Sequence, residues 1–74
     1  MKDIRYDILE HLGTLGEPVK GWAREVNMIS WNDGPAKIDI RSWSEDRQKM
    51  SKGITLTQEE ARELAELILQ KCNF

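Results

Sequence analysis

Apolar side chains recur every three or four residues near the C-terminal end of the chain, which is typical of one face of an amphipathic helix. The positions on this stripe are Ala61, Leu64, Ala65, Ile68 and Cys72, with Leu67 and Leu69 widening it. Thr57 is followed three residues later by Glu60, and this pair forms a capping box that marks the start of a helix. The sequence therefore predicts a helix of about four turns whose apolar face packs against the rest of the domain.

Before residue 57 the apolar positions alternate with polar ones, which is the period of a β-strand. We predict four strands, over residues 4–12, 19–31, 36–43 and 53–56. The predicted fold class is α+β: a single domain over residues 1–74 with a four-stranded antiparallel meander followed by one C-terminal helix, in the order ββββα.

Turn-forming residues separate the predicted strands. Pro18 favours a turn at residues 16–18, because proline cannot continue a strand ladder. Asp33 and Gly34 favour a tight hairpin turn between the second and third strands. Because the second strand is long, we also expect a bend or bulge at Gly21.

The second and third strands each carry two distinct faces. One parity is apolar and is predicted to form the core under the helix; with the fourth strand it includes Val26, Met28, Ile38, Ile40, Ile54 and Leu56. The opposite parity carries Ile29, Trp31, Lys37, Arg41 and Trp43. One helix covers only one side of a sheet, so this second face must meet water, another subunit or a ligand.

Tryptophans interleaved with cations on an open sheet face are typical of proteins that bind single-stranded nucleic acid. Bases stack on the indole rings, while lysine and arginine side chains follow the phosphates. The same tryptophans are also compatible with a dimer interface, a second small core or a surface that docks a partner peptide. The pattern alone leaves these alternatives open.

Composition limits the other possibilities. A chain of 74 residues buries only about 60% of the surface that its unfolded form exposes, so we expect a further source of stabilisation. Cys72 is the only cysteine and His11 the only histidine, so neither a disulfide nor a metal cluster supplies it. Oligomerisation is the remaining source of stabilisation that we expect. The N-terminal residues carry no apolar signal region and no apolar run reaches membrane length, which predicts a cytoplasmic protein without membrane contact.

Charge is unevenly distributed along the chain, although the formal net charge is only −2. Residues 18–56 hold seven Lys or Arg against five Asp or Glu, whereas residues 57–74 hold two against four. No nucleophile–base pair, phosphate-binding loop or ligand cluster is recognisable. We therefore predict no enzyme activity, no cofactor and no small-molecule substrate.

Several segments in a fixed order resemble a known family. "KIDIRSW", a polar loop, "KGITL" and a glutamate-rich capped helix are similar to the DNA-binding domain of transcriptional coactivator positive cofactor four, and most of all to its small bacterial relatives. The resemblance covers residues 22–70, and "DIR" at 39–41 and "KGITLT" at 52–57 are its most specific parts. It implies a curved sheet, a homodimer assembled through helices and sheet ends, and binding of single-stranded DNA with little sequence preference.

The resemblance also assigns roles by position. It places the stacking aromatic residue at Trp31, the third-strand arginine at Arg41 and the basic residue before the fourth strand at Lys52. Only Trp43 represents the aromatic pair that follows "DIR", because Ser44 occupies the second position. The basic cluster before the fourth strand is thin, with Arg47, Lys49 and Lys52, and Ile29 stands where relatives can have a basic residue. These differences imply weaker attraction for phosphate.

The predicted function is binding of single-stranded DNA by a homodimer, in transcription regulation, replication or repair. The candidate nucleic-acid-binding residues are Trp31, Arg41, Trp43, Lys37, Lys52, Lys49, Trp22, Arg24 and Lys20. Lys20, Trp22 and Arg24 have the opposite parity to Trp31, so they join the site only if a bulge at Gly21 or the curvature of the strand turns them. RNA binding on the same face and a peptide-docking module are the alternatives.

Overall fold

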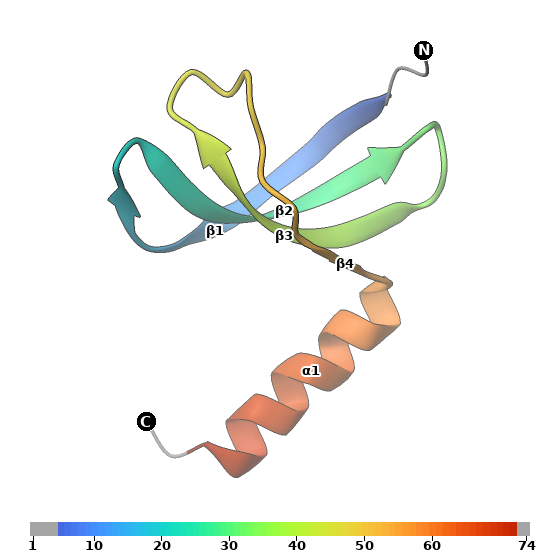
Figure 1. Cartoon of the computed structure of the whole chain (residues 1–74). Coiled ribbons are helices and arrows are strands. Elements are labelled where there is room, and N and C mark those ends of the chain that lie inside the picture. The colour runs from blue at the N-terminus through green and yellow to red at the C-terminus, as the bar shows by residue number, and fades with distance from the viewer. Residues whose placement is uncertain (1–4, 73–74) are drawn as a thin grey trace.

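The computed structural model of the protein describes residues 5–72. Its elements are β1 (Tyr6–Val19), β2 (Trp22–Trp31), β3 (Ala36–Ser44), β4 (Ile54–Leu56) and α1 (Gln58–Lys71). The strands form one antiparallel sheet in the order β1-β2-β3-β4, and the helix follows the sheet (Figure 1). The predicted four-stranded meander with a C-terminal helix is confirmed. Ile4, in the predicted first strand, lies outside the described residues.

The turn between β1 and β2 lies later than predicted. Val19 pairs with Trp22, and the intervening Lys20 and Gly21 have φ angles of 51° and 80°. Both angles are positive, as a tight hairpin turn requires, and glycine adopts such an angle without strain. The predicted turn at residues 16–18 is wrong, and Gly21 belongs to the turn rather than to a bulge. Pro18 is tolerated within β1 because β1 is an edge strand.

The hairpin between β2 and β3 is where the sequence predicts it. Asn32 and Asp33 have φ angles of 50° and 61°, and the Gly34 N–H donates to the Trp31 carbonyl oxygen at 2.8 Å. Asn and Asp tolerate the left-handed region better than other side chains do. The central turn residues are therefore Asn32 and Asp33, one position earlier than the predicted Asp33 and Gly34.

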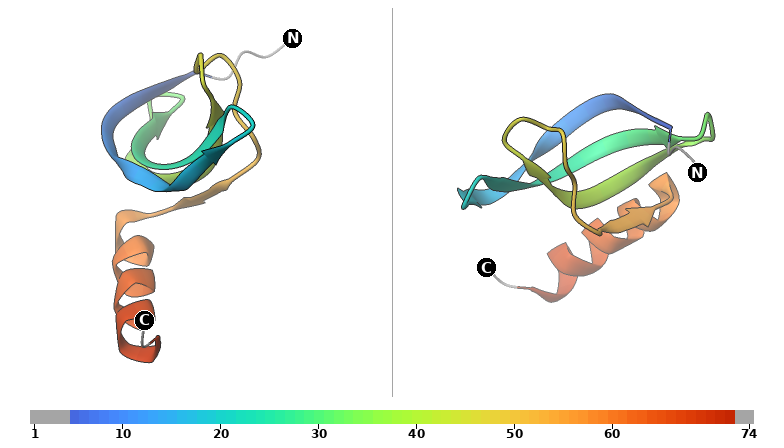
Figure 2. Two further views of the ribbon diagram at one scale, coloured as in Figure 1. Left: turned by 90° about the vertical axis from the view of Figure 1, so that its left-hand side faces the viewer. Right: turned by 45° about the horizontal axis from the view of Figure 1, so that its top comes forward.

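The sheet is strongly curved. The pairing of β1 with β2 shifts register between Ile8 and Glu10, between His11 and Gly13, and between Leu15 and Val19. Such irregularities bend a strand and increase its twist. Viewed along the sheet, the strands curl almost into a ring and the helix lies outside it (Figure 2, left). We call the inner surface of this curl the concave face and the outer surface the convex face.

The buried side chains lie on the concave face, which reverses the predicted core. Ile29 is fully buried and Trp43 is 2% exposed, together with the polar residues Glu25, Asn27 and Asp39. The curl of the sheet encloses these side chains within the chain's own strands. The predicted core residues are instead half-buried or exposed on the convex face: Val26, Met28, Ile38, Ile40, Ile54 and Leu56.

The helix begins as predicted but does not cover the sheet. Thr57 accepts a hydrogen bond from the Glu60 N–H at 3.0 Å, and the Glu60 carboxylate accepts one from the Thr57 N–H at 2.9 Å. Thr57 is the one residue between β4 and α1, and its extended backbone directs the helix away from the sheet (Figure 1). Consequently α1 has no buried residue, and the prediction that it packs on the sheet of its own chain is wrong. Within residues 5–72 no helix is long and apolar enough to cross a membrane.

Candidate nucleic-acid interface

Strand pairing places four of the predicted site residues on the concave face. Residues opposite one another on neighbouring strands project to the same side of a sheet. Ile29, which is buried inside the curl, pairs with Lys37, and alternation then places Trp31, Arg41 and Trp43 on the same side. The structure thus brings together Trp31, Lys37, Arg41 and Trp43, although they differ greatly in exposure.

An aromatic cluster forms the centre of the concave face. The Tyr6 ring lies 5.5 Å from the Trp31 ring and 5.7 Å from the Trp43 ring, with interplanar angles of 45° and 52°. Tilted ring pairs at these distances are favourable because the positive edge of one ring meets the negative face of the other. β1 therefore contributes the side chain that links the two tryptophans of β2 and β3.

Trp43 is not the exposed stacking platform that the sequence suggests. It is 2% exposed, and the guanidinium carbon of Arg47 lies 5.0 Å from its ring centroid, which gives a cation–π contact. With Tyr6 also in contact, little of the indole remains accessible to a base. The prediction of an exposed Trp43 is wrong because the curl of the sheet buries this end of β3. Trp31 is half-buried and keeps part of its surface accessible.

Arg41 is held rigidly against Trp31 by a buried carboxylate. Its Nε and Nη2 atoms donate to the two oxygens of Asp39 at 2.6 and 2.7 Å, and Asp39 is fully buried. The guanidinium carbon lies 4.8 Å from the Trp31 ring centroid. Thr55 Oγ1 donates to the same Asp39 at 2.9 Å. The charge of Arg41 is thus balanced within the chain, so a phosphate has to compete with Asp39 for it.

A second buried carboxylate, Glu25, holds Arg47. Arg47 Nη1 donates to both Glu25 oxygens at 2.9 and 2.7 Å, and the Asn27 amide donates to Oε1 at 3.2 Å. His11 Nδ1 lies 2.7 Å from Asn27 Oδ1. Burial alone would raise the pKa of Glu25, but these hydrogen bonds and the charge of Arg47 outweigh it and hold the pKa below its usual value. This network ties β1, β2 and the β3–β4 loop together.

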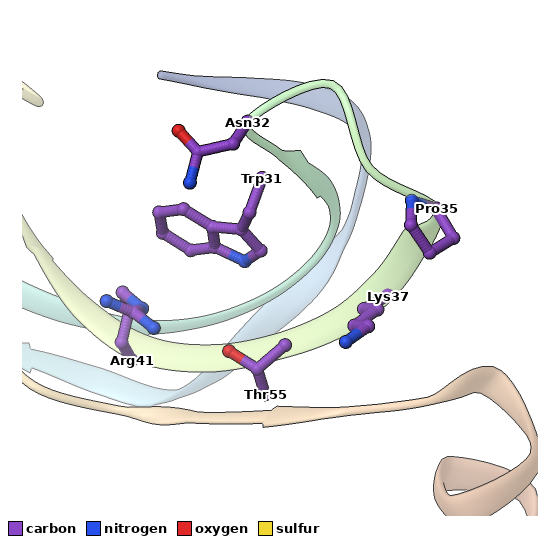
Figure 3. Close-up of a pocket in the computed structure, with 6 residues that line it drawn as sticks. All are labelled: Trp31, Asn32, Pro35, Lys37, Arg41 and Thr55. Carbon is purple, nitrogen blue, oxygen red and sulfur yellow. The ribbon is translucent and has the colours of Figure 1, made fainter. Parts of the chain in front are cut away.

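Beside Trp31 the concave face opens into a hollow of about 440 Å³. Its lining consists of Trp31, Asn32, Pro35, Lys37, Arg41 and Thr55 (Figure 3). Lys37 makes no hydrogen bond or ion pair with any residue between 5 and 72, so within this part of the chain its charge is uncompensated. The hollow thus combines an accessible indole edge with a cation that is available to a ligand.

The remaining predicted residues lie around the concave face rather than on it. Trp22 and Arg24 pair with Ser44 and Ser42, which places them on the convex face. The proposed reorientation of the strand at Gly21 therefore does not occur, and Lys20 lies in the turn itself.

Two of these basic side chains, Lys52 and Arg24, nevertheless lie near Arg41 of the concave face. Lys52 and Arg24 line a hollow of about 320 Å³ together with Arg41. Lys49 and Trp22 line another, of about 420 Å³, beside Glu45 and Asp46. The structure thus places Lys52 near Arg41, whereas Lys49 lies beside acidic side chains that weaken its attraction for phosphate.

The close approach of β4 to β3 depends on Gly53. A Cβ atom at this position would collide with the Ile40 carbonyl oxygen and the Arg41 Cβ. The "KG" pair of the motif thus has a structural reason: glycine allows β4 to pair beside Arg41, and the preceding Lys52 is carried to the same place.

Three residues of the interface, Tyr6, Asn32 and Arg47, are not among the candidate binding residues predicted from the sequence. Tyr6 lies in a strand whose bulges disrupt the simple alternation, although its position opposite Trp31 is a signal once the hairpin register is known. Asn32 appears in the sequence only as a turn residue. Arg47 lies in a polar loop, and only its φ angle of 61° and its contacts show that the loop folds back over Trp43.

A strongly curved antiparallel sheet with tryptophan, lysine and arginine side chains on its inner surface defines a class of small nucleic-acid-binding domains. The sequence profile of Transcriptional Coactivator p15 (PC4) matches residues 19–67, which span β2 to most of α1. The chain belongs to this family, and the resemblance predicted from "KIDIRSW" and "KGITLT" is confirmed. Domains of the family bind single-stranded DNA and are not enzymes.

The similarity extends beyond the matched domain in one bacterial relative. An uncharacterized protein from Treponema pallidum (strain Nichols) is 46% identical over 66 residues, which cover 89% of this chain and 78% of that protein. Coverage this wide includes part of β1, which lies almost entirely outside the family match.

Proposed function

We propose that this protein binds single-stranded DNA without strict sequence preference, through the concave face of its sheet, as part of transcription regulation, replication or repair. The observation that carries this proposal is the hollow beside Trp31, where an accessible indole lies next to the uncompensated Lys37. Membership of a single-stranded-DNA-binding family supports it.

In the proposed mechanism Trp31 supplies the stacking surface for an unpaired base. Stacking on an aromatic side chain is sequence-tolerant because every base presents a π-face. Arg41 lies over Trp31 and is held by Asp39 and the Ser51 carbonyl oxygen, so its role is to orient the indole. Tyr6 supports Trp31 directly and is itself in contact with Trp43.

Lys37 supplies the free positive charge for the phosphates, and Lys52 extends the basic track past Arg41. The charges of Arg41 and Arg47 are already balanced by the buried carboxylates of Asp39 and Glu25. Few phosphate contacts are therefore available, so we expect only a moderate dependence of affinity on salt.

We further propose that the protein is a homodimer. The helix exposes Leu64, Leu67, Ile68 and Leu69, and Ile54 on the convex face is 53% exposed. A single chain of this size with so much apolar surface in water is poorly stabilised. Packing of the two helices and convex faces against each other covers these side chains and leaves both concave faces open, which doubles the track for a strand.

A fluorescence titration tests the proposed function. Tryptophan emission is followed while oligo-dT, a duplex of the same length and an RNA of matched length are added at low and high salt. The proposal predicts stronger quenching and tighter binding with the single-stranded DNA, and weaker binding as salt rises. Tighter binding of the RNA would transfer the function to RNA on the same face. No response to any nucleic acid would overturn the proposal and favour a peptide-docking module.

A further inference from the structure

The hollow beside Trp31 presents a defined set of hydrogen-bonding groups as well as a stacking surface. Neither indole is part of this set, because the Nε1 atoms of Trp31 and Trp43 are both buried. The tryptophans therefore offer their rings but no accessible donor. Pro35 has no side-chain hydrogen-bonding group, and each guanidinium nitrogen of Arg41 already donates to Asp39, Met50 or Ser51. Recognition of base edges therefore falls to the other residues that line the hollow, namely Asn32, Lys37 and Thr55.

Asn32 presents a donor to the hollow. Its Oδ1 atom accepts a hydrogen bond from the Arg5 N–H at 3.2 Å, which fixes the orientation of the amide because an N–H group can bond only to the oxygen. The Nδ2 atom is then the free end, and it makes no hydrogen bond within residues 5–72. Figure 3 shows this nitrogen on the side of Asn32 that faces the Trp31 ring.

Lys37 presents a second donor, and Thr55 presents an acceptor. The ammonium group of Lys37 has no partner within residues 5–72. The hydroxyl hydrogen of Thr55 is committed to Asp39 Oδ1 at 2.9 Å, so its oxygen offers only lone pairs to the hollow. The carboxylate of Asp39 adds no acceptor, because Asp39 is fully buried and does not line the hollow.

The hollow thus offers two donors and one acceptor. The Watson–Crick edges of thymine, uracil and cytosine each carry two acceptors and one donor, which is the complementary set. Adenine carries one acceptor and one donor, and guanine carries one acceptor and two donors. We propose that this hollow is a base-selective subsite that prefers pyrimidines over purines, with Lys37, Asn32 and Thr55 reading the base edge beside Trp31.

This inference rests on the proposed function and sharpens it, because a protein without strict sequence preference still favours pyrimidine-rich single strands. Each hydrogen bond to a base edge contributes about a fivefold difference in affinity. A pyrimidine satisfies one more hydrogen bond than adenine, so we expect oligo-dT and oligo-dC to bind about fivefold more tightly than oligo-dA of the same length.

The test has to separate hydrogen bonding from stacking, because oligo-dA is itself more strongly stacked in solution. Affinities are measured at pH 8 for oligo-dT, oligo-dC, oligo-dA and an oligo-dT in which difluorotoluene replaces thymine. Difluorotoluene has the shape of thymine, but its fluorine atoms are poor acceptors. The inference predicts that this oligonucleotide binds at least as weakly as oligo-dA. Binding as tight as that of oligo-dT would overturn the inference.

Asn32→Asp provides the matched protein variant. Aspartate tolerates the φ angle of 50° and still accepts from the Arg5 N–H, but it replaces the amide donor with an acceptor. The added negative charge weakens binding of oligo-dT and oligo-dA alike. The ratio of their affinities is nevertheless expected to fall several-fold, because the donor that selects the base is lost. Asp33→Asn makes the reverse exchange on the same turn, outside the hollow, and is expected to keep the ratio.

Base selection and single-strand binding can be overturned separately. Equal affinity of the wild-type protein for all single strands, or an unchanged ratio in Asn32→Asp, would overturn base selection and leave single-strand binding intact. Absence of binding to every single strand would overturn the proposed function and this inference together.

Discussion

At the residue scale, the concave face depends on two buried carboxylates that each hold an arginine against a tryptophan. Asp39 positions Arg41 over Trp31, and Glu25 positions Arg47 over Trp43. A buried charge is tolerated only when it is paired and hydrogen-bonded. The two pairs therefore fix the aromatic side chains in place and, at the same time, reduce the free charge that the face offers to DNA.

Removal of the Trp31 ring tests its role in stacking. Trp31→Ala is expected to weaken binding of oligo-dT by about 2 kcal/mol, or roughly thirtyfold, because the stacking surface is lost. Fluorescence anisotropy of a labelled oligonucleotide measures this change. Trp31→Phe keeps an aromatic ring and is expected to retain most of the affinity. Equal affinity of the alanine variant and the wild-type protein would remove Trp31 from the site.

Neutralising Asp39 tests the first carboxylate–arginine pair. Asp39→Asn leaves the largely buried Arg41 without its counter-charge, so we expect a loss of about 3 kcal/mol in the free energy of unfolding. Urea denaturation followed by circular dichroism measures it. The double variant Asp39→Leu with Arg41→Met removes both charges and is expected to recover part of the loss. A single variant as stable as the wild type would show that the pair contributes little.

At the element scale, the hydrophobic pattern predicts the number and order of the elements but not how the strands curve. The alternation in β2 and β3 separates two faces correctly: Trp31, Lys37, Arg41 and Trp43 do share one side. Which side is enclosed depends on the bulges of β1 and on its length, and neither is visible in a local pattern. A bulge changes the parity of every residue after it, so Tyr6 could be placed opposite Trp31 only from the structure.

The network around Glu25 joins three segments and makes their association sensitive to acid. The pKa of Glu25 is lowered in the folded protein, so its contribution to stability is present above the ordinary glutamate pKa of about 4.3 and is lost as the pH falls through the folded value. Thermal unfolding measured from pH 7 down to pH 3 is expected to show this loss. Glu25→Gln is expected to be less stable at pH 7 and to lose less on acidification. An equal loss of stability on acidification in the wild-type protein and Glu25→Gln would show that Glu25 is not the source of the acid sensitivity.

At the scale of the whole molecule, a single chain leaves its largest apolar surfaces in water. The helix projects from the sheet (Figures 1 and 2). Its leucines are exposed, and the apolar residues of the convex face are half-buried or exposed. The sequence predicts oligomerisation from chain length and from the lack of disulfides and metal ligands. It does not predict that the helix leaves its own sheet, because the apolar stripe looks the same whether it packs within the chain or on a second copy.

Charges placed on the apolar face of the helix test the proposed dimer. Leu64→Glu with Ile68→Glu is expected to shift sedimentation from two chains to one at micromolar concentration, because burying the new carboxylates between helices is unfavourable. Glu66→Lys also alters the charge of the helix, but away from the apolar stripe, and is expected to stay dimeric. A wild-type protein that sediments as one chain would contradict the dimer.

Binding of single-stranded DNA at the concave face is tested most directly by a nuclear magnetic resonance titration of the ¹⁵N-labelled protein with oligo-dT. The three tryptophans give three indole N–H signals, and they lie at different places: Trp31 at the hollow, Trp43 in the cluster and Trp22 on the convex face. Binding at the concave face predicts the largest shifts for the Trp31 indole and for the backbone amides of Asn32, Lys37 and Thr55. Shifts confined to Trp22 and the convex face, or no shifts at all, would contradict binding at the concave face.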